Sequence, residues 1–287
     1  MNRISIKSYA KINLGLDVTG VLPNGYHTVK MIMQTISLCD NLYFEKRKQP
    51  DIKLKTNLPY LPVNEKNIVY KAIKLFKENY PFPDGLYCNI TKHIPVAAGM
   101  AGGSGNAAAA LIAMDRLFST RLSMDELMKL GVKLGADVPF CLLGGTALAE
   151  GIGELLTPLP SPPKAKILIV KPSISVSTAD VYNALNLGPD SVHPDINACI
   201  SAIKDNSLYK LCSRLGNILE DVTFKQHPEI SEIKEQMLSL GAAGSLMSGS
   251  GPTVFGLFSD EEKAESAHKY FSSLPEYQKN THLCDFT

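Results

Sequence analysis

The sequence lacks an excess of charge of either sign. Across 287 residues, 29 lysines and arginines are balanced by 28 aspartates and glutamates, so the net charge is +1. A chain that binds nucleic acid or a membrane surface by electrostatic attraction carries a basic bias. We therefore predict no nucleic-acid partner and no membrane partner, although a local charged patch is compatible with a neutral total.

Long hydrophobic runs are also missing. A transmembrane helix needs about 18 consecutive apolar residues, and no such run occurs. The N-terminal stretch MNRISIKSYAKINLGL lacks the apolar core of a signal peptide. We expect a cytoplasmic protein.

The cysteines lack the close spacing of a zinc site. No CxxC pair occurs, and most of the cysteines stand in apolar stretches. We expect free, buried thiols and no protein-built metal site. The six cysteines are Cys39, Cys88, Cys141, Cys199, Cys212 and Cys284.

What is present is typical of a folded globular chain, with 45% apolar and 20% charged residues. The length favours two domains. Four prolines within residues 158–163 mark a linker between an N-terminal domain over 1–157 and a C-terminal domain over 164–287. We predict an α+β fold in both domains, with largely antiparallel sheets.

The pattern of apolar residues predicts the individual elements. The first fifty residues alternate as a β-meander, with a turn at Pro23–Gly25. Further strands are expected at 42–45, 52–55, 86–91, 144–150, 165–170, 245–248, 253–258 and around 282. Helices are expected from Asn67, over 106–118, from Ser123 to about 135, and over 260–272. After residue 164 this order is βαββαβ with inserted helices.

The strongest local motif is a glycine-rich loop between a strand and an apolar helix. It runs PVAAGMAGGSGN from Pro95 to Asn106. Small residues let backbone amides approach a ligand, and a helix start attracts anions, so phosphate is the expected occupant. The loop is neither a Walker A motif nor a good GxGxxG. A flexible turn that permits tight helix packing is the alternative.

Two side chains beside this loop could serve a nucleotide. Ser104 can bond a phosphate oxygen or Mg²⁺. Lys92, at the end of the preceding strand, could reach the nucleotide, or it could be an ordinary solvated lysine.

A charged pair is predicted from two distant segments. Asp137 stands in the apolar stretch GADVPF, where a carboxylate is costly unless it is used. Lys11 and Asn13 share one face of a strand. A lysine beside Asp137 would keep it ionised to accept a hydroxyl proton. Alternatively, Asp137 stabilises a turn and Lys11 is exposed.

A second small-residue turn lies near the C-terminus, in MSGSGPTVF from Met247 to Phe255. Its amides could form another anion-binding nest, or it could be a plain hairpin turn.

Taken together and in this order, these segments resemble the GHMP kinase superfamily. The segments AKINL at 10–14, NGYH at 24–27, GADVPF at 135–140 and MSGSGPTVF at 247–255 are most similar to the branch whose substrate carries a cytidine diphosphate group. The resemblance covers the whole chain. It implies an N-terminal domain like domain 2 of ribosomal protein S5, a ferredoxin-like C-terminal domain, ATP and Mg²⁺ as cofactors, and a monomer or weak homodimer.

The resemblance also implies roles for individual residues. Lys11 and Asp137 become the catalytic pair. Substrate binding falls to Asn13, Tyr26, His27, Tyr182, Gly249, Ser250 and Gly251, with Tyr26 and His27 as a clamp on cytosine. Nucleotide binding falls to Asn67, Lys92, Pro95, Val96, Ala97, Ala98, Gly99, Met100, Ala101, Gly102, Gly103, Ser104 and Gly105.

The loop departs from the usual family pattern, GLGGGSS followed by Asp or Asn. Ala101 replaces a glycine and Gly105 replaces the second serine. A positive φ at Ala101 would be strained, and Ser104 is the sole hydroxyl of the loop.

The sequence leaves three rivals to this interpretation. Another GHMP kinase, of the mevalonate or homoserine type, would share the loops. A non-catalytic ATP-binding module and a Rossmann-type oxidoreductase are the others.

Overall fold

A computed structural model describes residues 1–188 and 191–287. The chain divides into two compact units, neither of which is continuous in sequence. The first unit comprises residues 1–10, 38–96 and 101–144, and the second comprises 11–37, 97–100 and 145–287. The predicted division at residues 158–163 remains a prediction.

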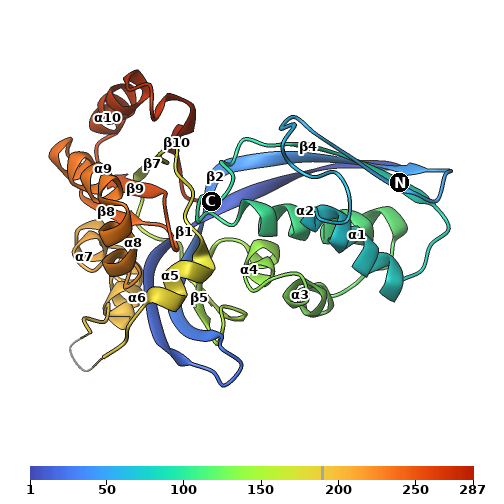
Figure 1. Ribbon diagram of the computed structural model, residues 1–287, viewed down its shortest axis with the longest axis horizontal. Coiled ribbons are helices and arrows are strands. Elements are labelled where there is room, and N and C mark those ends of the chain that lie inside the picture. Colours follow the sequence, from blue (N-terminus) through green and yellow to red (C-terminus); the bar gives the residue numbers. More distant parts are fainter. Residues whose placement is uncertain (189–190) are drawn as a thin grey trace. The chain divides into compact units, whose positions relative to one another are not determined.

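Two long strands contribute residues to both units. Strand β1 spans Arg3–Val21 and strand β2 spans His27–Arg47, and the two are paired (Figure 1). The separate strand expected at 42–45 is wrong, because these residues continue β2. Residues 3–9 of β1 alternate between exposed and more buried positions, whereas residues 11–18 are all buried. The second stretch is therefore covered on both faces.

In the first unit, helices cover one face of the sheet (Figure 1). Strand β4 (Gly85–Thr91) pairs antiparallel with β2 and parallel with β3 (Ile52–Thr56). Helix α1 (Ile68–Asn79) connects β3 to β4. The apolar faces of α1 and of helix α2 (Gly102–Phe118) pack into one core with these strands.

Helix α2 begins four residues earlier than the apolar pattern indicates. We expected its start at Asn106, but the last glycines of the loop are already helical from Gly102. Its alanines 107–110 are all buried, as expected for a central helix. The next helix, α3 (Met124–Val132), has the predicted capping box, in which Ser123 and Glu126 bond reciprocally.

The second unit contains two sheet regions. Strand β5 (Thr146–Glu150) joins β2 to β6 (Leu155–Leu159) by antiparallel pairing. Pro158 lies on β6, an edge strand, the place in a sheet where proline is tolerated.

The other sheet has the strand order β10-β7-β9-β8 and is entirely antiparallel. Its strands are β7 (Lys166–Val170), β8 (Gly244–Met247), β9 (Val254–Phe258) and β10 (Thr281–Cys284). Between β7 and β8 lie α5 (Thr178–Ala184), α6 (Ile196–Lys204), α7 (Leu208–Cys212), α8 (Glu220–Gln226) and α9 (Pro228–Ser239). Helix α10 (Glu261–Ser273) and a short 3-10 helix (Gln278–Asn280) precede β10. The predicted βαββαβ order with inserted helices is confirmed.

Cysteine pairing and membrane-spanning helices were both addressed by the sequence. Cys39, Cys88, Cys199 and Cys212 are free thiols. Burial raises the pKa of the Cys199 and Cys212 thiols to about 11, and it raises the pKa of Cys88 further. In the described part of the chain, no helix is both long and apolar enough to cross a membrane.

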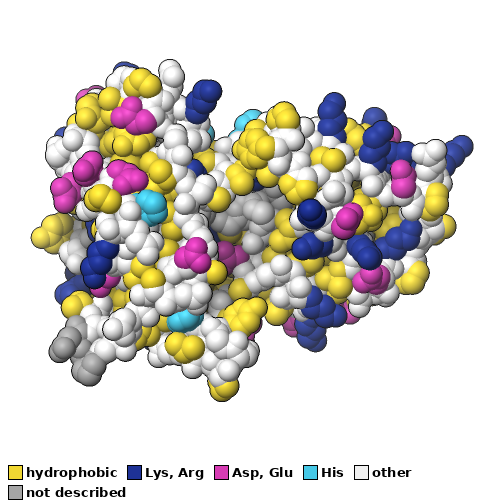
Figure 2. Space-filling view, in the orientation of Figure 1, with side chains coloured by type: hydrophobic (Ala, Val, Ile, Leu, Met, Phe, Trp, Pro, Cys, Tyr) yellow, Lys and Arg dark blue, Asp and Glu magenta, His cyan; other side chains and the backbone are white. Residues whose placement is uncertain are grey.

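The near-zero net charge conceals local differences. On the face shown in Figure 2, Lys and Arg predominate on the surface of the first unit, and both signs are scattered over the second.

Candidate active site

The glycine-rich loop has the backbone geometry of an anion-binding turn. Gly99 has φ of 68°, and Ala97 and Ala101 adopt positive φ values of 51° and 53°. Ala101 directly precedes α2 and supplies no capping side chain. The first amides of α2 therefore lack a side-chain cap and are suited to bind phosphate oxygens. The expected strain at Ala101 is confirmed.

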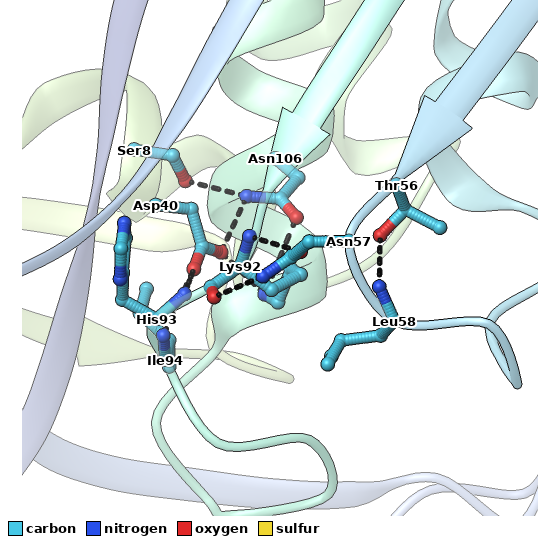
Figure 3. A network of polar contacts seen from close by, with 9 residues as sticks. All are labelled: Ser8, Asp40, Thr56, Asn57, Leu58, Lys92, His93, Ile94 and Asn106. Carbon is cyan, nitrogen blue, oxygen red and sulfur yellow. Dashed lines mark hydrogen bonds and ion pairs between the residues drawn. The ribbon is translucent and has the colours of Figure 1, made fainter.

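The base of this loop is fixed by a buried polar network in the first unit (Figure 3). Lys92 forms an ion pair with Asp40, and its Nζ also donates to Asn106 Oδ1 at 3.3 Å. The Asp40 side chain is fully buried and that of Lys92 is 6% exposed. The alternative that Lys92 is an ordinary solvated lysine is wrong. Its binding to nucleotide stays a prediction.

The tip of the loop, residues 97–100, belongs to the second unit. There the Ser248 hydroxyl donates to Gly99 O at 3.0 Å, and the Lys11 amide donates to Met100 O at 3.1 Å. A side chain at Gly99 would place its Cβ 2.2 Å from Ser248 O. The tip of the loop and the turn after β8 thus meet backbone to backbone.

Lys11 is a buried cation rather than an exposed strand lysine. It is 5% exposed, and its Nζ donates to Asn13 Oδ1 at 2.8 Å. Asn13 is fully buried, and its amide lies 3.2 Å from the sulfur of Met31. The alternating strand pattern correctly placed Lys11 and Asn13 on one face.

Asp137 occupies the residue before helix α4 (Val138–Leu143). Its side chain does not cap that helix. Asp137 belongs to the first unit and Lys11 to the second, so their pairing stays a prediction.

The predicted substrate residues of the second unit form two groups. The rings of His27 and Tyr182 lie with centroids 5.1 Å apart and planes at 53°. Tyr26 is 58% exposed, and its amide donates to Asn24 in the turn before β2. The structure thus brings His27 and Tyr182 together from distant segments, and it leaves the Tyr26 ring at the surface.

The second group is the turn 249–251, which is held by residues that the sequence did not reveal. Asn217 donates to Met247 O at 2.9 Å and to Gly249 O at 2.7 Å. The hydroxyl of Thr178, the first residue of α5, lies 2.8 Å from that of Ser250. A plain hairpin turn would not need these side-chain partners. No local motif marks Asn217 or Thr178, because each acts on a segment far away in sequence.

Asn67 has a structural role in the helix that follows it. Its Oδ1 accepts from Val69 N at 2.9 Å as the cap of α1, and its Nδ2 donates to Pro62 O at 2.7 Å. Its assignment to the nucleotide stays a prediction. Among the described residues, no three His, Cys, Asp or Glu side chains are grouped as metal ligands.

Comparison with protein families identifies the relatives of this chain. Residues 67–145 match "GHMP kinases N terminal domain" and residues 190–275 match "GHMP kinases C terminal". The chain belongs to the GHMP kinase family. It is therefore an ATP-dependent small-molecule kinase, which agrees with the phosphate-binding geometry of its loop.

Individual relatives of this GHMP kinase carry a more specific name. A protein of Lachnoclostridium phytofermentans, 56% identical over 100% of this chain and 98% of its own length, is named 4-diphosphocytidyl-2-C-methyl-D-erythritol kinase. One of Lachnospira eligens, 52% identical over 94% of each chain, has the same name. A crystal structure titled 4-(cytidine 5'-diphospho)-2C-methyl-D-erythritol kinase is 31% identical, covers 99% of both chains and has a TM-score of 0.82.

Proposed function

We propose that this GHMP kinase transfers the γ-phosphate of ATP to the 2-hydroxyl of 4-diphosphocytidyl-2-C-methyl-D-erythritol. The products are the 2-phosphate and ADP, and the reaction belongs to non-mevalonate isoprenoid precursor biosynthesis. The observation that carries the proposal is the high identity, over the full chain, to relatives that bear this name. The aromatic pair of His27 and Tyr182 supports a nucleobase-bearing substrate.

Phosphoryl transfer requires a group that accepts the hydroxyl proton. We assign Asp137 as this base and Lys11 as the cation that keeps it ionised. As the 2-oxygen attacks the γ-phosphorus, its proton passes to Asp137, the bond from phosphorus to the β-γ bridging oxygen breaks, and ADP leaves. The buried, hydrogen-bonded ammonium of Lys11 suits this task, because a cation removed from water acts strongly on its surroundings.

The nucleotide phosphates are assigned to the loop and the start of α2, where amides and the helix dipole favour negative charge. Mg²⁺ needs few protein ligands when phosphate oxygens supply the others. The hydroxyl of Ser104, in the first turn of α2, fits that requirement. When bound, Mg²⁺ would neutralise charge that develops on the phosphates.

The first experiment is an assay of ADP release against a panel of alcohols. We expect turnover with 4-diphosphocytidyl-2-C-methyl-D-erythritol, and little with homoserine or mevalonate.

The same assay tests the catalytic base. Asp137→Asn should lower kcat at least about a thousandfold, since it removes proton acceptance, and should leave ADP affinity within about twofold. Asp125→Asn, on an exposed carboxylate of α3, is the matched control and should retain full activity. Near-normal kcat in Asp137→Asn would remove the base assignment.

The second experiment addresses the cytidine clamp. Tyr182→Ala should raise KM for the substrate about tenfold by removing the ring that faces His27, with KM for ATP within about twofold. Tyr182→Phe keeps the ring and should behave almost as the wild type. If Tyr182→Ala leaves the substrate KM unchanged, the cytosine ring of the substrate binds elsewhere. ATP binding with neither ATP hydrolysis nor turnover of any alcohol would favour the non-catalytic alternative.

A further inference from the structure

The buried carboxylate of Asp40 has an unusual set of partners. Its Oδ1 accepts from the amides of His93 at 2.8 Å and Ile94 at 2.9 Å. Its Oδ2 accepts from Asn106 Nδ2 at 2.8 Å and forms the ion pair with Lys92. One side chain on β2 therefore receives four polar contacts.

All four of these contacts lie at the two ends of the phosphate loop. Lys92, His93 and Ile94 immediately precede residue 95, and Asn106 immediately follows residue 105. Figure 3 shows both ends converging on Asp40. The carboxylate thus holds both ends of the eleven-residue segment 95–105, which has four glycines: the residues that follow β4 on one side, and Asn106 in the second turn of α2 on the other.

Other side chains hold the same two ends in place. Asn57 clamps the backbone of Lys92, accepting from its amide at 2.8 Å and donating to its carbonyl at 3.1 Å. Asn106 Nδ2 also donates to the Ser8 hydroxyl at 3.0 Å. A Cβ on Gly102 would lie only 3.1 Å from Lys92 Nζ, so the ammonium reaches the first residue of α2.

Stability alone does not account for such an arrangement. Burying an ion pair commonly adds less stability than apolar side chains of the same volume would. A loop rich in glycine has much conformational freedom to lose when it binds phosphate, and fixing its ends beforehand reduces that loss. An electrostatic clamp at the loop ends supplies this preorganisation.

We propose that Asp40 is a positioning residue for phosphoryl transfer, which holds the phosphate loop in its binding geometry through Lys92 and Asn106. Asp40 acts through the loop and does not itself touch the nucleotide. The inference rests on the proposed assignment of the nucleotide phosphates to this loop.

The test is to measure ADP affinity in the presence of Mg²⁺ by calorimetry on full-length variants. Asp40→Asn keeps the size of the side chain but removes the charge and turns an amide toward Lys92 and Asn106. We expect the dissociation constant for ADP to rise at least about tenfold and KM for the alcohol to stay within about twofold. The amides of His93 and Ile94 should exchange their hydrogens faster.

Two further variants keep the test decisive. Asn57→Ala removes the two hydrogen bonds that hold the backbone of Lys92. Because Asn57 is exposed, this variant should fold even if Asp40→Asn does not. It should weaken ADP binding about threefold. Asp115→Asn is the matched control at the other end of α2, where Asp115 accepts from Thr120 Oγ1 at 2.8 Å and Leu122 N at 2.9 Å. It should lower the melting temperature and leave ADP affinity within twofold, as a purely structural role predicts.

Gly103→Asp distinguishes a failure of the role proposed for Asp40 from a failure of the phosphate assignment on which that role rests. A Cβ at Gly103 would make only an ordinary van der Waals contact, 3.9 Å from Ile68 Cγ2, and a carboxylate there should repel phosphate. If Gly103→Asp weakens ADP binding while Asp40→Asn and Asn57→Ala bind ADP as the wild type does, the role of Asp40 is refuted and the loop assignment stands. If Gly103→Asp has no effect on ADP affinity, the phosphates bind elsewhere and both are refuted.

Discussion

The base and the tip of the glycine-rich loop at residues 95–105 are held by different kinds of force. At the base, the charged carboxylate of Asp40 contacts the Lys92 ammonium, the Asn106 side-chain amide and two backbone amides. At the tip, the contacts are backbone carbonyls, one serine hydroxyl and a glycine with no space for a side chain. Electrostatic contacts therefore predominate at the base of the loop, and steric fit predominates at its tip.

This difference predicts how each part tolerates change. An electrostatic contact weakens gradually when its geometry shifts, whereas overlap with a backbone atom forces the backbone to move. Substitutions at the tip should disturb the fold, and substitutions at the base should mainly disturb the binding of phosphate.

Gly99→Ala should have the largest effect. The new Cβ would overlap Ser248 O, and alanine disfavours the positive φ of this residue. We expect about 3 kcal/mol of lost stability in urea unfolding. Gly103→Ala, at a position with no positive φ and no Cβ contact closer than 3.9 Å, should stabilise the helix start by up to about 1 kcal/mol. Equal effects of the two variants would show that the tip is not sterically restricted.

Ser248→Ala should have the next largest effect at the tip. It deletes the hydroxyl that donates to Gly99 O and leaves a partly buried carbonyl without this donor. Unfolding should require about 1.5 kcal/mol less free energy. Ser248→Thr retains the hydroxyl and tests whether the hydrogen bond or the small volume matters. Wild-type stability in Ser248→Ala would mean that this hydrogen bond contributes nothing.

Ala101→Gly, between tip and base, should act in the opposite direction. Relief of the positive φ should stabilise the protein by up to about 1 kcal/mol, reduced by the extra freedom of glycine in the unfolded chain. Ser119→Gly, at the left-handed residue that ends α2, should stabilise comparably. Only Ala101→Gly should also change ADP affinity. A change of ADP affinity in Ser119→Gly would argue against a local effect at the loop.

The smallest expected effect is a dependence of protein stability on pH, which comes from Glu220, a residue that supports the tip of the loop. Glu220 accepts from Met247 N, the residue before Ser248, and pairs with Lys234. Burial raises its pKa above the ordinary value of 4.5, against the opposing effect of Lys234. The folded state then binds its proton more tightly than the unfolded state, so this contribution to stability is present below pH 4.5 and is lost as pH rises through the raised pKa.

Glu220→Gln removes this titration. The wild type and the variant should have similar stability in acid, and the wild type should lose stability relative to the variant as pH rises. Parallel unfolding curves across this pH range would contradict the assignment.

Local patterns in the sequence predicted a good part of the fold and of the candidate site. The apolar alternation of β1 placed Lys11 and Asn13 together, and the capping box at Ser123 located α3. The replacement of a glycine by Ala101 predicted strain at a position where φ is 53°. Each of these features depends on residues that are close in sequence.

The features that were missed depend on long-range pairing. Asp40 is 52 residues from Lys92 and 66 from Asn106, and nothing around it in the sequence distinguishes it from an ordinary strand aspartate. Asn217 holds a turn 30 residues away. The helical state of Gly102 and Gly103 also escaped prediction, because glycine has low helix propensity and the surrounding fold overrides it.

The raised pKa values of two thiols have a practical consequence. With a pKa of about 11, roughly one in ten thousand Cys199 or Cys212 side chains is a thiolate at pH 7. The thiolate is the form that reacts with alkylating reagents. A cysteine introduced at an exposed position such as Tyr209, which is 84% accessible, should therefore react with maleimide much faster than these two. Fluorescent labelling at one chosen position should be feasible with Cys199 and Cys212 in place, once the half-buried Cys39 and Cys141 have been replaced by serine.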